Sequence, residues 1–197
     1  MDSFKALNAH FKKVVKTNSR QLIQMETYQG YVYYGNPYVL VKSKTDKEIK
    51  LQEQKLNLSM DKVDSRFFHT EYDNEIVMNV KLAKNMLQVL CKASNSVNPL
   101  MKFDFSGDEV LVDWIDKSNK LGTPLRSCKI GLSNKVNKPI TFGFNTILLR
   151  DVFMLLNSLK AKQVTVKYQN NTLRPIMLEI DDTQIVVAPV RFEEARV

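Results

Sequence analysis

The chain has 197 residues, and 44% of them are apolar, which suits one large domain or two small ones with a buried core and excludes wholesale disorder. Its 29 Lys and Arg residues outnumber its 21 Asp and Glu residues, and the resulting charge of +8 favours a polyanionic partner, most often nucleic acid.

The N-terminal part of the chain predicts one helix followed by strands. Apolar residues recur at helical spacing over residues 3–16, and Ser3 can cap this helix at its start. Strand-like runs, separated by turns that contain Gly, Asn and Pro, follow at residues 21–28, 31–34, 38–43 and 49–58. Residues 60–68 are ambiguous: Met60, Val63 and Phe67 have the spacing of a short helix, but the segment is brief and mixed in charge.

From residue 76 onward, one order of elements occurs twice. The first set comprises a strand at 76–80, a helix at 82–93, a hairpin of strands 100–105 and 110–115 around the turn Ser106-Gly107-Asp108, and a strand at 126–132. The second set comprises a strand at 140–144, a helix at 146–159, and strands at 164–168, 175–180 and 184–190. The buried face of the helix at 82–93 is expected to contain Leu82, Met86, Val89, Leu90 and Ala93.

These elements predict an α+β fold built from repeated β-α-β-β-β units. We expect a divergent repeat at residues 1–75. A second domain at residues 76–197 would then contain two repeats, 76–135 and 136–192, and a short C-terminal tail.

The basic excess lies in the three longer predicted helices, and the rest of the chain is close to neutral. Each helix has one apolar face for a sheet, so its other face is basic. Lysine side chains hold phosphates without reading bases, so a shared basic surface would bind DNA of any sequence. The alternative is that each helix simply has a solvated face. The predicted DNA-binding residues are Lys5, Lys12, Lys13, Lys16, Lys81, Lys84, Lys92, Arg150, Lys160 and Lys162.

The C-terminal segment resembles a known family. An aromatic–Asn pair, Phe144-Asn145, opens a helix that contains the step Leu149-Arg150-Asp151, and the chain closes with Val187-Ala188-Pro189-Val190-Arg191. These features resemble the bacterial DNA sliding clamp, the beta subunit of DNA polymerase III. Residues 76–135 share only the order of elements with that family, and residues 1–75 hardly match it.

The resemblance implies the DNA clamp fold, with helices around a central hole and antiparallel sheets outside. It also implies a hydrophobic pocket beside the last strand, which binds short peptides of the DNA polymerase and the clamp loader. Carried over by position, the pocket residues are Val186, Ala188, Pro189, Val190 and Arg191. Ala188 is smaller than the residue usual at its position, so a closing strand with a buried Val stripe is the alternative.

The resemblance further implies a homo-oligomeric ring around double-stranded DNA, closed by head-to-tail contacts. Rings of this family contain twelve repeats, so three helices per chain predict a tetramer. Counting residues 60–68 as a fourth helix predicts a trimer, which we favour slightly. Because the chain is short for a clamp, we expect a phage or mobile-element origin.

Nothing in the sequence indicates an enzyme. His10 and His69 are the only histidines, and no catalytic or metal-binding motif is present. Cys91 and Cys128 form no pair that indicates a disulfide or metal site, and they suit a reducing cytosol. We therefore expect no catalytic residue, metal or cofactor.

We also expect a cytoplasmic protein without a signal peptide or membrane span. Two alternatives to a sliding clamp stay open: a clamp-like decoy that engages a host clamp or loader, and a monomeric, non-specific DNA-binding protein.

Overall fold

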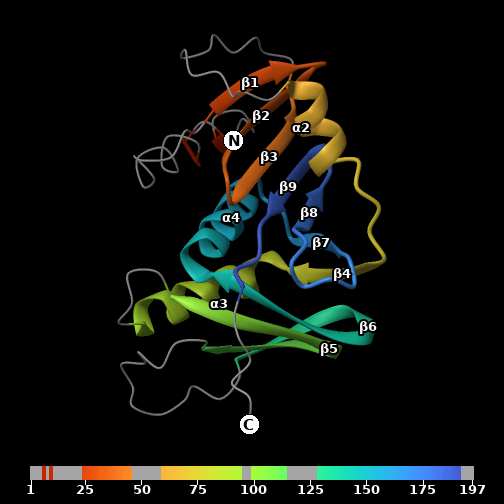
Figure 1. Ribbon diagram of the computed structural model, residues 1–197. Coiled ribbons are helices and arrows are strands. Elements are labelled where there is room, and N and C mark those ends of the chain that lie inside the picture. The colour runs from red at the N-terminus through yellow and green to blue at the C-terminus, as the bar shows by residue number, and fades with distance from the viewer. Residues whose placement is uncertain are drawn as a thin grey trace.

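A computed structural model describes residues 6–7, 9–10, 24–45, 59–94, 99–114 and 128–191. These residues form an α+β fold in which helices pack on both faces of an antiparallel sheet (Figure 1). The predicted fold class is thereby confirmed. Residues 6–7 and 9–10 are helical, as predicted, and the strand predicted at 49–58 lies outside the described residues.

The described strands form a single nine-stranded sheet in the order β1-β2-β3-β9-β8-β7-β4-β6-β5. The strands are β1 (Gln24–Tyr28), β2 (Tyr31–Asn36), β3 (Val39–Lys44), β4 (Asn74–Asn79), β5 (Leu100–Trp114), β6 (Cys128–Asn145), β7 (Gln163–Tyr168), β8 (Ile176–Ile180) and β9 (Thr183–Val187). The helices are α2 (Met60–Phe67), α3 (Val80–Ala93) and α4 (Thr146–Ser158).

The N-terminal and C-terminal strands of the chain are joined within this sheet. Strand β3 pairs with β9 in antiparallel register, with Val39 opposite Val187 and Ser43 opposite Thr183. The hydroxyls of Ser43 and Thr183 lie 2.8 Å apart and join the two strands through their side chains as well. The N-terminal meander β1-β2-β3 therefore continues the sheet of the C-terminal elements, whereas the division into domains at residue 75 stays a prediction.

Strands β5 and β6 correct one local prediction. The segment Ser106-Gly107-Asp108 does not turn the chain back, because β5 runs on from Leu100 to Trp114 beside β6. The register shifts on either side of Gly107, which has a φ of 58°. A glycine with positive φ accommodates a bulge inside a long strand, so a turn-like sequence here bends a strand without ending it.

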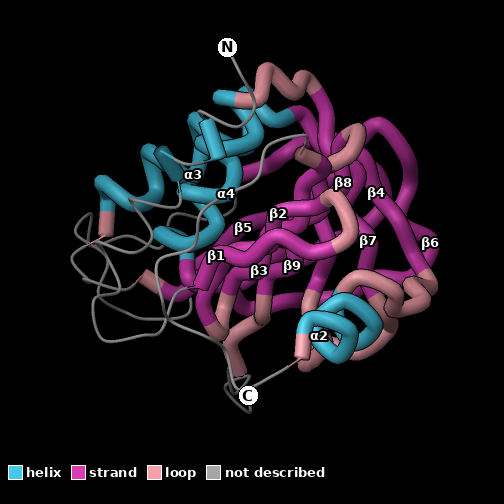
Figure 2. The backbone as a smooth tube through the Cα atoms, turned by 90° about the horizontal axis from the view of Figure 1, so that it is seen from above, coloured by secondary structure: helices cyan, strands magenta, loops and turns pink. Residues whose placement is uncertain are grey.

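The two faces of the sheet carry different helices (Figure 2). Helices α3 and α4 pack on one face, called the α3/α4 face, over a large apolar cluster that contains Ile185 and Val187 of β9. Helix α2 packs on the opposite face, called the α2 face, over a smaller cluster that contains Val186. Adjacent β9 residues point to opposite faces because side chains alternate along a strand.

The buried face of α3 differs from the prediction. The residues that α3 buries are Val80, Ala83, Leu87 and Leu90. Leu82 is 58% exposed and Val89 is 61% exposed, so two of the five predicted core residues face outward. Helix α3 has two apolar stripes, and the sheet takes the one with Ala83, whose small side chain allows the helix to approach closely.

Candidate nucleic-acid interface

Helix α3 places basic side chains at the end where they cost stability. The Asn79 side chain caps the helix by accepting a hydrogen bond from the Leu82 N–H at 3.0 Å. Lys81 follows in the first turn, which has no acidic residue, and Lys84 lies in the next turn. The start of a helix carries partial positive charge, so it disfavours cations and favours a bound anion. This placement of lysines lowers the stability of the helix and favours the binding of a polyanionic ligand.

The loop after α4 brings further lysines to the same end of α3. The backbone N–H of Val80 donates to the carbonyl of Lys162 at 3.0 Å, which fixes this loop beside the start of α3. Lys160, Lys162 and Lys81 are all exposed. The structure therefore gathers four of the predicted DNA-binding lysines, from two separate stretches of chain, around one helix end.

The other end of α3 is less clearly basic. Lys92 is exposed in the last turn of the helix. Arg150 of α4 donates from Nε and Nη2 to Oδ1 of the buried Asp151, at 3.0 Å and 2.9 Å. Burial raises the pKa of the neighbouring Cys91 thiol, and a hydrogen bond from Arg150 opposes this rise. Arg150 thus links α3 to α4 and shares its charge with Asp151, so it is less available to a phosphate than the lysines.

The remaining predicted cations, Lys5, Lys12, Lys13 and Lys16, lie outside the described residues. Their helix is described only at residues 6–7 and 9–10. Leu7 joins the apolar cluster of the α3/α4 face, and Nδ1 of the buried His10 lies 3.2 Å from the Tyr34 hydroxyl. His10 is therefore part of the protein interior.

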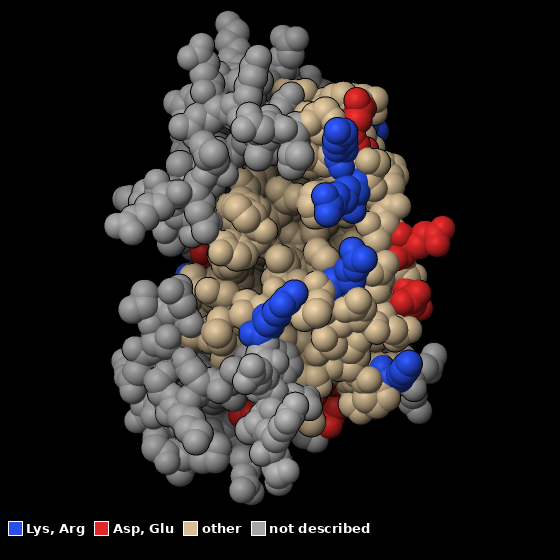
Figure 3. Space-filling view, viewed as in Figure 1, with Lys and Arg blue, Asp and Glu red and all other residues tan. Residues whose placement is uncertain are grey.

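Acidic residues are nearly absent from α3 and α4. Within α3 and α4 the only acidic residue is Asp151, which is buried and paired. The exposed acids Glu71, Asp73 and Glu75 lie instead in β4 and the segment before it. In Figure 3, acidic side chains stand at the right margin of the molecule, the side on which Figure 1 places β4. A polyanion is therefore favoured on the α3/α4 face and disfavoured at the margin of β4.

A second candidate site lies beside the C-terminal segment. The Ala188 N–H donates to the Tyr38 carbonyl, and the Val190 N–H donates to the Gly143 carbonyl, both at 2.8 Å. These bonds carry the chain from β9 across to β6, along the edge of an open cavity of about 860 Å³. The cavity is lined by Asp104, Phe105, Ser106, Pro139, Ile140, Thr141, Thr172, Leu173, Val190 and Arg191.

The predicted pocket residues do not all reach this cavity. Val190 and Arg191 line it, whereas Val186 is buried in the cluster beneath α2. Ala188 and Pro189 are half-buried in the connecting segment. The sequence analysis missed Leu173, which is 54% exposed at the cavity. No sequence signal identified Leu173, because single exposed apolar side chains are common on protein surfaces.

Solved structures with this arrangement are bacterial sliding clamps. The beta subunit of Caulobacter crescentus DNA polymerase III superimposes with a TM-score of 0.70 at 9% identity, over 97% of this chain and 65% of its own. A DNA polymerase sliding clamp from Pseudomonas aeruginosa gives a TM-score of 0.66 at 13% identity, over 86% of this chain and 58% of its own. The beta subunit from Streptococcus pyogenes gives 0.66 at 12% identity, over 88% and 59%.

The chain has the sliding-clamp fold. Identities of this size show the fold alone, and the chain is a divergent example of it. It spans less than two thirds of each of these neighbours. No protein-family model matches the sequence, and no curated protein matches it either.

Two features of the described residues bear on other functions. No group of three or more His, Cys, Asp or Glu residues in them could hold a metal ion. No helix among them is both long enough and apolar enough to cross a bilayer.

Proposed function

We propose that this chain is a subunit of a DNA sliding clamp, a non-enzymatic ring that surrounds duplex DNA and tethers a DNA polymerase. The observation that carries the proposal is the group of exposed lysines around the start of α3, on a helical surface whose only acid is buried, within the sliding-clamp fold. Lysines at the positive end of a helix cost stability, and a polyanion in the ring offsets this cost.

The mechanism is topological. A closed ring cannot leave duplex DNA sideways, so its contacts with phosphates can be weak and independent of sequence. Lysine suits this purpose, because its flexible point charge follows the phosphate backbone without fixing a register. Stronger contacts that read bases would hinder sliding.

The position of α2 bears on the size of the ring. The trimer required a fourth helix on the surface that lines the hole, and residues 60–68 were the candidate. These residues form α2 as expected, but α2 packs on the opposite face from α3 and α4. With α3, α4 and the helix that contains Leu7 as the lining helices, a tetramer is now the better-supported ring.

DNA binding is tested with paired charge reversals. The double variant Lys81→Glu/Lys92→Glu should bind duplex DNA more weakly and with a flatter dependence on salt, because fewer counterions are released. Lys62→Glu/Arg66→Glu is the matched control, since it changes the net charge by the same amount and both residues are exposed on α2 at the opposite face. Fluorescence anisotropy with labelled duplex at several salt concentrations measures both quantities. Equal losses of DNA affinity in the variant and in the control would refute the proposal that the α3/α4 face binds DNA.

Encirclement needs its own measurement. The protein is bound to nicked circular DNA, separated from free protein by gel filtration, and then released by cutting the circle with a restriction enzyme. A ring leaves only after the cut. A monomeric DNA-binding protein dissociates equally from circular and from cut DNA. A decoy binds neither the circular nor the cut DNA.

We further propose that the cavity beside Val190 and Leu173 receives an apolar side chain of a partner peptide, because Phe105, Pro139 and Ile140 join these two residues in an apolar part of its lining. Leu173→Asp should abolish stimulation of the polymerase and leave folding unchanged, because Leu173 is half exposed. Val186→Asp should instead unfold the α2 face, where Val186 is 4% exposed. Primer extension on a circular template, together with circular dichroism, separates the two effects. If Leu173→Asp stimulates the polymerase as well as the wild type does, the proposed peptide-binding pocket is refuted.

A further inference from the structure

Helix α2 covers only part of the α2 face of the sheet. Side chains that stand opposite one another on neighbouring strands point to the same face. One such row across four strands consists of Glu75 on β4, Lys167 on β7, Met177 on β8 and Val186 on β9. Met177 and Val186 are buried in the apolar cluster beneath α2, whereas Glu75 is exposed. The helix therefore covers one end of this row and leaves the other end open.

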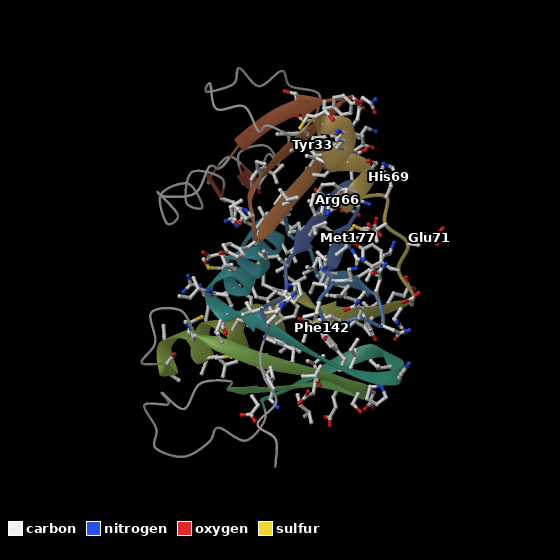
Figure 4. All side chains as sticks on the ribbon, in the orientation of Figure 1. Tyr33, Arg66, His69, Glu71, Phe142 and Met177 are labelled. Carbon is white, nitrogen blue, oxygen red and sulfur yellow. The ribbon has the colours of Figure 1, made fainter. Side chains whose placement is uncertain are left out.

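The segment that joins α2 to β4 forms a wall beside this open end. In Figure 1 it runs down the right side of the molecule, and in Figure 4 Glu71 points outward from it while Met177 lies in the sheet. Two hydrogen bonds tie the segment to the turn after β7. Gln169 Nε2 donates to the Glu71 carbonyl at 2.8 Å, and the Asn170 N–H donates to Oδ2 of Asp73 at 3.0 Å. The wall is therefore fixed to the sheet.

An open cavity of about 490 Å³ lies between this wall, the end of α2 and the sheet. One side of the cavity is apolar, because Phe68, Tyr72 and Met177 line it. All three residues belong to the apolar cluster beneath α2 or pack against it, and Tyr72 is only half-buried. The cavity therefore presents an aromatic ring and an aliphatic surface to whatever enters it.

The other side of the cavity is acidic. The carboxylates of Asp73, Glu75 and Glu179 line it together with the ammonium of Lys167, which leaves two negative charges. Lys167 Nζ forms an ion pair with Glu179, and Gln184 Nε2 donates to Oε1 of Glu179 at 2.8 Å. Asp73 and Glu75 are exposed at the rim. A chain with an overall charge of +8 thus has a local site that favours a cation.

We propose that this cavity binds an arginine side chain of a partner protein. A guanidinium is a planar cation that pairs with carboxylates and stacks on aromatic rings, and its aliphatic stem packs on apolar surface. Asp73 and Glu75 supply the carboxylates, and Tyr72 supplies the ring. Burial and the charge of Glu179 raise the pKa of Tyr72 to about 12, so this ring stays neutral at neutral pH.

This site goes beyond the proposed function and does not depend on it. It lies on the α2 face, opposite the lysines around the start of α3, and it shares no lining residue with the cavity beside Val190. A partner bound through an arginine here can therefore stay bound while the α3/α4 face is occupied by a polyanion. Binding of arginine by a protein that circular DNA does not retain supports this site and still refutes the clamp.

The test is fluorescence anisotropy of a labelled tetra-arginine amide titrated with the full chain, without DNA. Because the chain as a whole repels this probe, saturable binding requires a local acidic site. Asp73→Asn/Glu75→Gln should raise the Kd about tenfold, since two exposed charge pairs are lost. Asp108→Asn/Asp182→Asn is the matched control and should leave the Kd unchanged. It removes the same charge from two exposed residues that do not line the cavity.

Two further measurements complete the test. A tetra-lysine amide should bind more weakly than tetra-arginine, because an ammonium neither stacks on a ring nor pairs in a bidentate way. Gln184→Lys places an ammonium beside Glu179 and should also weaken binding; it decides alone if circular dichroism shows that the double variant has lost secondary structure. The proposal is overturned by a wild type that does not bind tetra-arginine, by folded variants with the wild-type Kd, by an equal loss in the control, or by equal affinity for the two peptides.

Discussion

The two faces of the sheet hold their helices by different means. On the α3/α4 face, Phe142 packs its ring against Phe105, Phe144 and Tyr168, with ring centres 5.8 to 5.9 Å apart. On the α2 face the apolar cluster is small, and a charged network supplements it. Figure 4 shows Phe142 deep in the lower part of the molecule and His69 at the end of α2 beside the surface.

Asp64 is the centre of the network on the α2 face. Its Oδ1 accepts hydrogen bonds from Lys42 Nζ at 2.7 Å and from the Tyr33 hydroxyl at 2.8 Å, and its Oδ2 lies 2.9 Å from His69 Nε2. Lys42 also lies over the Tyr31 ring, 4.6 Å from its centre. A second contact joins the Tyr28 hydroxyl to Asp61. These bonds attach α2 to strands β1, β2 and β3.

The two faces of the sheet therefore differ in how firmly they hold their helices. Apolar burial is spread over many residues and does not depend on pH. A buried carboxylate that holds a lysine concentrates the attachment in one group, because each partner is costly when it loses the other. We therefore expect α2 to detach while α3 and α4 remain folded.

Loss of the Phe142 ring on the α3/α4 face should destabilise the whole domain. Phe142 is 0% exposed, and Phe142→Ala should lower the free energy of unfolding by about 3–5 kcal/mol. Phe67→Ala on the half-buried side of α2 is the control and should cost less than half as much. Urea denaturation monitored by circular dichroism measures both. Equal losses would show that the two faces are not separate.

Removal of the Asp64 carboxylate should act on α2 alone. Asp64→Ala leaves the Lys42 charge nearly buried, with a side chain 10% exposed, and should cost roughly 2–3 kcal/mol. The double variant Lys42→Met/Asp64→Leu removes both charges and should recover part of this loss. Hydrogen exchange should show protection falling in α2 and persisting in α3. If protection falls equally in α2 and α3, the variant unfolds the whole domain, and the proposal that Asp64 attaches α2 alone is contradicted.

Acid should release α2 before the rest of the fold. Burial by itself would raise the pKa of Asp64, but hydrogen bonds from Lys42, Tyr33 and His69 outweigh it and lower the pKa. Lys167 and Gln184 similarly outweigh burial at Glu179 and lower its pKa. A lowered pKa gives stability that is present above the ordinary carboxyl value of about 4 and is lost as pH falls through the folded value.

The measurement is a comparison of pH profiles. Hydrogen exchange or Tyr fluorescence for α2 should change below about pH 4, while the far-ultraviolet dichroism of the other helices persists to lower pH. In Asp64→Asn the early transition should disappear. Its persistence in that variant would place the acid-sensitive group elsewhere.

The sequence predicted most elements because their patterns are local. The strands β7, β8 and β9 and the helices α2, α3 and α4 followed from periodicity. The clamp fold itself followed from the resemblance of the segment around Phe144-Asn145 to sliding clamps. The buried face of α3 did not follow, because Leu82 and Leu87 belong to two stripes of similar apolarity. The position of α2 also did not follow, since an eight-residue helix carries no information about which side of a sheet it covers.

The candidate sites were predictable only in part, for the same reason. Charge along α3 identified Lys81 and Lys92, but the approach of Lys162 to Val80 depends on how the loop after α4 folds back. Leu173 reaches the cavity beside Val190 only through tertiary structure. The phage or mobile-element origin and the cytoplasmic location stay predictions.

The smallest expected effect distinguishes the helix starts of the two faces. Asn79 caps α3 with its side chain, whereas Ser59 at the start of α2 makes no such hydrogen bond. Asn79→Ala should cost about 1 kcal/mol, because it leaves the Leu82 N–H without its acceptor. Ser59→Ala should change stability by less than about 0.5 kcal/mol, since no cap is lost. Thermal unfolding of both variants measures the difference. Equal shifts would mean that α2 is fixed at its start as firmly as α3, and the contrast between the faces would then rest on Asp64 alone.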